Sequence, residues 1–131
     1  HILCGLSSFL RFFRGSKSMR FSESLKKNVD FQNVYKNGRV YSNRLLVMYV
    51  LENNKNSNRI GISVSKKVGN SVIRHHITRL IRESYRLQED MFNSGLDIVV
   101  VARVNAKNSN YSDIESALLH LGHLQRILID R

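Results

Sequence analysis

The chain has 131 residues, 42% of them hydrophobic, and its 21 Lys and Arg against 10 Asp and Glu give a formal net charge of +11. This length suffices for one hydrophobic core and hardly for two, so we expect a single domain. The charge favours a polyanionic partner, either nucleic acid or an anionic membrane surface. The lack of an apolar run of about 18 residues excludes a transmembrane helix, and the single cysteine excludes an internal disulfide, which is typical of a reducing cytoplasm.

Residues 1–18 have the composition of an extension. Their apolar stretch precedes most of their basic residues and no small-residue cleavage site follows it, so the segment does not match a secretory signal peptide. We interpret residues 1–18 as a disordered upstream or non-native extension, Met19 as the natural start, and residues 19–131 as the domain. The alternative is an amphipathic extension that binds a membrane or a partner.

A short helix is predicted between residues 28 and 38. Phe31, Val34 and Tyr35 share one face at i, i+3 and i+4, Asn28 can cap the first turn, and Gly38 supplies the stop. By pattern alone, ordinary core packing is the favoured interpretation of this partly aromatic stripe.

Strand patterns follow. Residues 44–51 alternate with apolar side chains on both faces, which predicts a strand covered on both sides, and a shorter strand is expected around Val40 and Tyr41. The polar segment 52–58 is typical of a turn that joins neighbouring antiparallel strands. The β-branched run 96–102 predicts a buried strand.

Between these strands, the stretch 59–86 contains seven Lys or Arg and one acid, Glu83, and its pattern changes halfway. Residues 59–65 alternate as a strand with one apolar face. A basic loop follows, in which Gly69 is flexible and Asn70 and Ser71 are able to cap a helix. The stretch therefore predicts a strand, a basic loop and a helix.

This helix has two opposed faces when residues are placed at about 100° per position. The apolar face holds Ile73, Ile77, Leu80 and Leu87. The opposite face holds Arg74, His75, Thr78, Arg79, Arg82 and Arg86. Arginine suits phosphate recognition because its planar fork bonds two oxygens at once. A solvated amphipathic helix is the ordinary interpretation of a charged face, but charge of nearly one sign favours a polyanion-binding surface here.

A last helix is predicted after a polar loop. Ser112 and Glu115 have the spacing of a capping box, and the helix is expected to extend to about Leu128. Its apolar side is built from Ile114, Ala117, Leu118, Leu121 and Leu124. The order of elements predicts an α+β fold with helices layered on a mostly antiparallel sheet.

The sequence shows no catalytic constellation. The acids are scattered, and His120 and His123, three apart on the last helix, have no Cys or acid at ligand spacing, which disfavours a metal site. His75 and His76 point to different sides of their helix because neighbours lie about 100° apart. No phosphate-binding GxxxxGK[ST] loop is present.

The central stretch resembles the signature of the protein subunit of bacterial ribonuclease P. The matching residues are Ser65 to Val72, then Arg74, Arg79, Arg82 and Glu83. The resemblance begins just after Met19 and extends from residue 25 to about residue 128 without a large gap. The sequence departs from the family pattern at three positions: the family usually has Asn at the position of His75, often a basic residue at that of His76, and usually Lys at that of Thr78.

The resemblance implies a single α+β domain with about four mostly antiparallel strands and three helices, in the order α-β-β-β-α-β-α with a left-handed βαβ crossover. It implies an accessory subunit of an endoribonuclease whose catalytic RNA, with magnesium ions that are bound mainly by that RNA, removes the 5′ leader of precursor transfer RNA. The implied partners are the catalytic RNA and precursor transfer RNA, in the cytoplasm, with no membrane and no obligate protein partner.

Site residues follow from the resemblance by position. The residues expected to bind RNA are Arg59, Lys66, Lys67, Asn70, Arg74, His75, Arg79, Arg82 and Arg86. The residues expected to line a cleft for the single-stranded leader are Phe31, Tyr35 and Tyr49. No protein side chain is expected to be catalytic or to bind metal. These roles are physically coherent, because stacking holds unpaired bases and cationic side chains hold a duplex backbone.

The alternative function is that of a ribosomal or other structural RNA-binding protein, which a basic α+β domain would suit equally. A DNA-binding helix-turn-helix is disfavoured because no second helix accompanies the basic one. A membrane-surface protein is disfavoured because the basic helix turns its apolar side toward a core.

Overall fold

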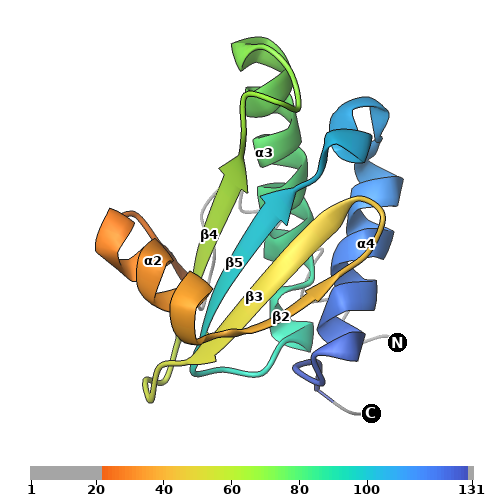
Figure 1. The fold of residues 1–131 in the computed structure, drawn as a ribbon. Coiled ribbons are helices and arrows are strands. Elements are labelled where there is room, and N and C mark those ends of the chain that lie inside the picture. The colour runs from red at the N-terminus through yellow and green to blue at the C-terminus, as the bar shows by residue number, and fades with distance from the viewer. Residues whose placement is uncertain (1–21, 130–131) are drawn as a thin grey trace.

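The computed structural model describes residues 22–129 (Figure 1). Its helices are α2 (Asn28–Asn37), α3 (Ser71–Leu87) and α4 (Tyr111–Leu124), with short 3₁₀ helices η1 (Glu89–Met91) and η2 (Val104–Asn108). Its strands are β1 (Ser22–Ser24), β2 (Arg39–Ser42), β3 (Leu46–Glu52), β4 (Asn58–Val64) and β5 (Leu96–Ala102). The predicted α+β class and order of elements are confirmed, with β1 as an addition. The extension predicted for residues 1–18 lies outside the described residues.

The described strands form one sheet in the order β1-β4-β5-β3-β2. β3 pairs antiparallel with β2 and β5, whereas β4 pairs parallel with β1 and β5. The sheet is therefore mixed, with one strand more than the four expected. β1 is too short to have a strand pattern, and a hydrogen bond of 2.8 Å between Ser22 Oγ and Tyr85 Oη ties it to α3.

The prediction that segment 52–58 joins neighbouring antiparallel strands is wrong. β5 lies between β3 and β4 and pairs along its length with both. The physical reason is burial. β5 is the most apolar strand, and its central position in the sheet allows both of its faces to be covered, so that Ile98, Val99 and Val100 are fully buried.

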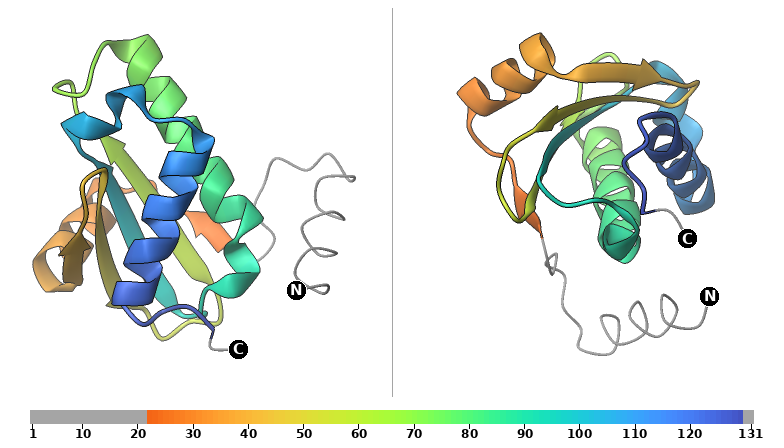
Figure 2. Two further views of the ribbon diagram at one scale, coloured as in Figure 1. Left: turned by 90° about the vertical axis from the view of Figure 1, so that its right-hand side faces the viewer. Right: turned by 90° about the horizontal axis from the view of Figure 1, so that it is seen from below.

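Helices cover the two faces of the sheet. The two views of Figure 2 place α2 on one face and α3 with α4 on the other. In Figure 1, β4 and β5 both point upward, β5 lies to the right of β4, and α3, which connects them, lies behind the sheet. The β4–α3–β5 connection is therefore left-handed, against the usual preference and as the family resemblance implies.

Each face has its own hydrophobic cluster. The larger cluster packs α3 and α4 on the sheet and includes Met48, Ile77, Ile98 and Leu118. The smaller one lies under α2 and contains Leu25, Val34 and Val99, with partly buried aromatic residues around it. No helix among residues 22–129 is long and apolar enough to cross a membrane.

Two predicted helix caps are wrong. Asn28 is the first residue of α2, and the residue at the cap position is Lys27, whose side chain forms no capping hydrogen bond. α4 begins one residue before Ser112, because Asn110 and Asp113 form the capping box in place of Ser112 and Glu115. Glu115 is engaged elsewhere, since its Oε2 accepts hydrogen bonds from Tyr111 Oη and Gln88 Nε2. α4 also ends at Leu124 rather than near residue 128.

Candidate nucleic-acid interface

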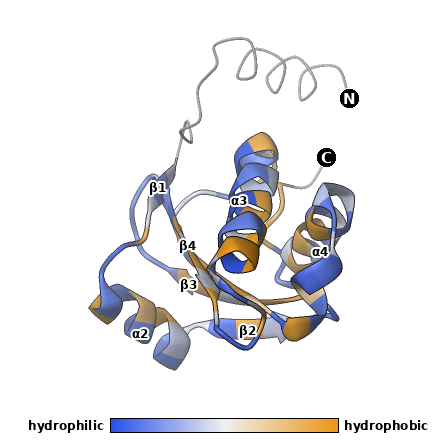
Figure 3. Cartoon of the chain, turned by 90° about the horizontal axis from the view of Figure 1, so that it is seen from above, coloured by the Kyte–Doolittle hydropathy of each residue, from blue (hydrophilic) through white to orange (hydrophobic). Residues whose placement is uncertain are grey.

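The loop before α3 presents its cations at one end of the sheet. β4 ends at Val64, and the exposed Lys66 and Lys67 follow. Asn70 Oδ1 then accepts a hydrogen bond of 3.0 Å from Ile73 N, which caps the helix as predicted. Figure 3 looks down on this end and shows hydrophilic and hydrophobic residues side by side along α3.

The exposed face of α3 carries a row of cations. Arg79 and Arg82 are exposed, as is His75, whereas Ile77 and Ile81 on the other side are fully buried. Arg74 is half-buried, and its Nε is a buried donor with no acceptor in the described part of the chain. We call Lys66, Lys67, Arg74, Arg79 and Arg82 the basic surface.

Arg86 does not extend the basic surface. It is only 5% exposed, and its guanidinium forms an ion pair with Glu83 one turn earlier. The helical pattern could not show this, because periodicity along one helix does not reveal which residues tertiary packing covers.

Arg59 also has carboxylate partners within the chain. Its Nε and Nη2 donate to the two oxygens of Asp97 at 2.9 and 2.6 Å, and its Nη1 donates to Asp30 at 3.3 Å. Burial alone would raise the pKa of Asp97, but hydrogen bonds from Arg59 and Asn53 outweigh burial and hold that pKa below its usual value. The network links α2, β4 and β5, so the structure separates Arg59 from the exposed cations of the basic surface.

The three aromatic residues predicted to bind the leader lie together. Phe31 and Tyr35 come from α2 and Tyr49 from β3, with ring centroids 6.3 Å apart for Phe31–Tyr35 and 4.9 Å apart for Tyr35–Tyr49. All three are half-buried, whereas Val34 between them on α2 is fully buried. Each ring is therefore anchored by packing and still accessible. We call these three residues the aromatic cluster.

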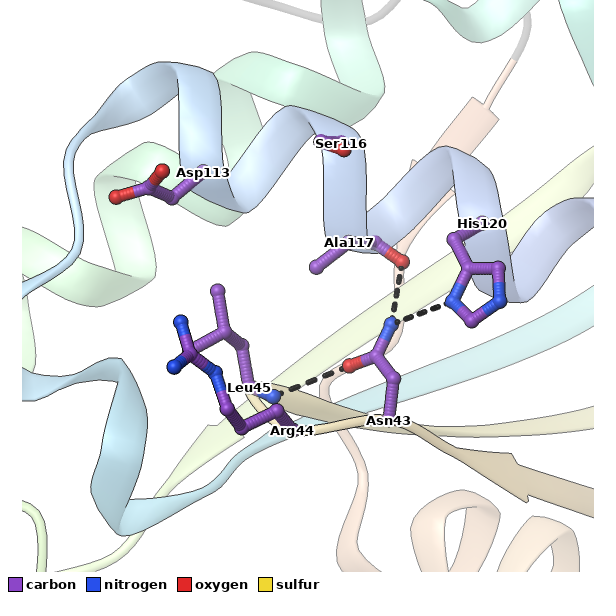
Figure 4. Close-up of a pocket in the computed structure, with 7 residues that line it drawn as sticks. All are labelled: Asn43, Arg44, Leu45, Asp113, Ser116, Ala117 and His120. Carbon is purple, nitrogen blue, oxygen red and sulfur yellow. Dashed lines mark hydrogen bonds between the residues drawn. The ribbon is translucent and has the colours of Figure 1, made fainter.

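A recess between the β2–β3 turn and α4 lies where the Asn43 side chain connects the turn to the helix (Figure 4). Asn43 Nδ2 donates to Ala117 O at 3.0 Å and lies 3.3 Å from His120 Nδ1, while Asn43 Oδ1 accepts from Leu45 N at 3.1 Å. The Asn43 side chain thus fastens the turn to the helix. Within residues 22–129 there is no group of three or more His, Cys, Asp or Glu side chains that could hold a metal ion.

One exposed cation at the same end of the sheet was missed by the sequence analysis. Arg103 directly follows β5, and because β4 and β5 are parallel, their ends bring Arg103 beside the loop that carries Lys67. The signal was a charged residue immediately after a buried strand. Its meaning depends on a strand pairing that a single sequence does not reveal.

Comparisons with known proteins indicate the family of this chain. A family model described as Ribonuclease P matches residues 19–126. The ribonuclease P protein component of Lachnoclostridium phytofermentans is 63% identical over 107 residues, 82% of this chain and 92% of that protein. The corresponding protein of Alkaliphilus metalliredigens is 54% identical over 103 residues, 79% of this chain and 93% of that protein.

Solved structures agree as well. The ribonuclease P protein of Staphylococcus aureus superposes with a TM-score of 0.75 at 38% identity, covering 81% of this chain and 97% of that one. The protein of Thermotoga maritima gives a TM-score of 0.73 at 28% identity, covering 80% and 97%. The chain therefore belongs to the bacterial ribonuclease P protein family, whose activity is the endonucleolytic processing of transfer RNA.

Proposed function

We propose that this chain is the accessory protein subunit of ribonuclease P, which binds the catalytic RNA and the 5′ leader of precursor transfer RNA. The observation that carries the proposal is the presence of two different surfaces on one small domain, a row of exposed cations and a cluster of half-buried aromatic rings. The basic surface is suited to a folded RNA backbone, and the aromatic cluster is suited to unpaired bases.

The basic surface is assigned to the catalytic RNA. Arg79 and Arg82 lie one turn apart on α3 and are exposed, so both guanidinium groups are available to phosphates of a duplex. Lys66 and Lys67 extend the same charge past the start of the helix. Such contacts depend on backbone geometry and charge, which is what a protein needs to dock on one structured RNA.

The aromatic cluster is assigned to the leader. Stacking on an aromatic ring is worth about 1–3 kcal/mol per base and accepts every base. A processing enzyme that meets many leader sequences needs this tolerance. Phe31, Tyr35 and Tyr49 are each anchored in the small hydrophobic cluster under α2, so little ordering of side chains is required when a base binds.

The cleavage chemistry is assigned to the RNA subunit, and magnesium is assigned mainly to that RNA. Asp30 and Asp97 are both paired with the guanidinium of Arg59, and this bound cation leaves them poorly suited to a metal ion. The role of the protein in this proposal is to bind and orient RNA.

The test is reconstitution with the ribonuclease P RNA of the same source and a precursor transfer RNA at low magnesium. The proposal predicts that the protein stimulates release of the leader. Absence of stimulation, together with tight binding to ribosomal RNA, would instead support a structural RNA-binding protein.

A further inference from the structure

One guanidinium joins the start of α2 to the sheet. Arg59 lies on β4, and its Nε and Nη2 donate to the two oxygens of Asp97 on β5 at 2.9 and 2.6 Å. Its third nitrogen, Nη1, donates to Asp30 Oδ2 at 3.3 Å. Asp30 lies in the first turn of α2 and directly precedes Phe31 of the aromatic cluster. A single planar group therefore links β4 and β5 to the part of α2 that carries Phe31.

The sheet end of this link is fixed without any contribution from α2. Asp97 is 2% exposed, and its Oδ1 also accepts a hydrogen bond of 2.8 Å from Asn53 Nδ2. Asn53 Nδ2 donates in addition to Ser57 O at 3.2 Å, and Asn53 Oδ1 accepts at 2.8 Å from the backbone N of Lys55, an exposed residue in the β3–β4 connection. Because the guanidinium is planar and bonds both oxygens of Asp97, the sheet sets the direction in which its third nitrogen points.

The first turn of α2 has few other restraints. Lys27 at the cap position forms no side-chain hydrogen bond, and Val34, one turn further on, is the only buried residue of the helix. The chain before the helix is tied to β4 by a hydrogen bond of 2.8 Å from Leu25 N to Ile60 O. Among residues 22–129, Asp30 is the one side chain of α2 that forms a hydrogen bond or ion pair with the sheet. The ion pair is therefore the main polar restraint on this turn.

Movement of the first turn would displace a ring of the aromatic cluster. Phe31 is half-buried and lies against Gly61, two residues after Arg59 on β4. Because side chains alternate along a strand, Arg59 and Gly61 face the same side of the sheet, the side that α2 covers (Figure 2). Neighbouring residues of a helix move together, so a shift or rotation at Asp30 also moves Phe31. The ion pair thus bears directly on where the Phe31 ring lies.

We propose that Arg59 and Asp30 are positioning residues for precursor binding, and that their ion pair holds the first turn of α2 where the Phe31 ring can stack on a base. The inference rests on the proposed function, which assigns that ring to the leader. Neither Arg59 nor Asp30 is assigned to the RNA itself. Arg59, which the family resemblance implied as an RNA ligand, acts through the helix instead.

The test is Asp30→Ala in the reconstituted holoenzyme, with affinity measured for precursor and for mature transfer RNA. The substitution leaves the Arg59–Asp97 pair in place and removes one negative charge, so net charge alone would tighten the binding of either RNA. The positioning role predicts the opposite sign for the precursor, a loss of about threefold to tenfold, which is a part of the value of one stacked base. Mature transfer RNA should show no loss.

Two further variants separate position from charge. Glu52→Ala removes an exposed carboxylate from the end of β3, outside the ion pair, and should cause no loss for either RNA. Asp30→Glu keeps a carboxylate on the first turn and should restore most of the precursor affinity. A failure of Asp30→Glu to restore it would count against the ion pair.

The position of the ring is measured separately by NMR on the free protein. The wild type should give nuclear Overhauser effects between the Phe31 ring and Gly61, which Asp30→Ala should weaken. Contacts of Val34 with Val99, in the small hydrophobic cluster under α2, should be retained, which distinguishes a displaced first turn from an unfolded helix. A precursor loss with an unchanged Phe31–Gly61 signal would show that Asp30 acts by another route and would overturn the inference.

Phe31→Ala, measured in parallel, separates this inference from the proposed function. If Phe31→Ala selectively weakens precursor binding and Asp30→Ala does not, only the positioning role is wrong. Equal losses for precursor and mature transfer RNA with Asp30→Ala would also overturn it. If neither variant distinguishes precursor from mature transfer RNA, the assignment of the leader to the aromatic cluster is itself wrong.

Discussion

The ring of Phe31 on α2 lies directly against Gly61 on β4. A Cβ built on Gly61 would come within 2.6 Å of Phe31 Cζ and 2.7 Å of Phe31 Cε1, closer than non-bonded carbon atoms approach. The absence of a side chain at Gly61 therefore sets where the aromatic ring lies on the sheet.

Gly61→Ala should displace the Phe31 ring and weaken binding of leader-bearing precursor by up to about 1–3 kcal/mol, the value of one stacked base. Binding of mature transfer RNA should not change. The measurement is a double-mutant cycle with Phe31→Ala on both ligands. If Gly61 acts through Phe31, Gly61→Ala should lower precursor affinity in the wild-type background and should have no further effect in the Phe31→Ala background. Losses that add in the double mutant would show that Gly61 acts by another route.

Arg79→Ala and Arg82→Ala should each weaken assembly with the catalytic RNA. Both side chains are exposed on α3, so their removal should leave the core intact. Each substitution should reduce the slope of log K against log[salt] by about 0.9, the value for one phosphate contact on a duplex. At 0.15 M salt this corresponds to a loss of affinity about fivefold larger than at 1 M salt. The measurement is a salt titration of assembly, with Lys55→Ala as the control. A slope that stays at the wild-type value would remove that arginine from the interface.

Arg59→Ala should act on stability. Removing the partner of the buried Asp97 should lower the free energy of unfolding by about 3 kcal/mol at pH 7, the lower end for a broken buried pair because Arg59 is 21% exposed. The folded-state pKa of Asp97 is depressed, so the stabilisation is present above the unfolded pKa of about 3.9 and is lost as the pH falls through the folded pKa.

The measurement is urea unfolding of wild type and Arg59→Ala at pH 7 and at successively lower pH. The difference between the two proteins should shrink as the pH falls through the depressed folded-state pKa of Asp97 and the carboxylate protonates. A difference that is the same at pH 7 and in acid would show that the ion pair is not its source. Asp30→Asn is the matched comparison and should cost less, since Asp30 is more exposed and accepts one bond of 3.3 Å.

Thr78→Lys should tighten assembly with the catalytic RNA at moderate salt and raise the salt slope by up to about one. Thr78 lies one turn after Arg74 on α3, and its hydroxyl donates only to Arg74 O, at 2.8 Å, a bond that helices do not require. Gln32→Lys adds the same charge to an exposed position on α2 and serves as the control. Equal gains for the two variants would indicate a general effect of net charge.

The sequence alone predicted what depends on local periodicity. The alternation in residues 59–65 and the opposed faces after Asn70 correspond to β4 and α3, because each pattern directly reflects which side chains a regular element buries. The grouping of Phe31, Tyr35 and Tyr49 was expected from the family resemblance, and the structure brings these residues from α2 and β3 together.

Features that depend on contacts distant in sequence were not predictable. The place of β5 between β3 and β4 decides that Arg103 lies beside Lys67, and no local pattern encodes that pairing. Arg86 has the helical position of an exposed residue, yet tertiary packing at the end of α3 buries it. Arg59 has the charge of an RNA ligand, but Asp97, 38 residues later in the chain, engages its guanidinium.

The most direct test of the two-surface account is the affinity of the holoenzyme for precursor and mature transfer RNA, measured beside its assembly constant. We predict that Phe31→Ala, checked with the ring-free Phe31→Leu, lowers precursor affinity alone, and that Arg79→Ala lowers the assembly constant alone. If both substitutions reduce the same quantities in the same proportion, the two surfaces do not have separate roles and the account is contradicted.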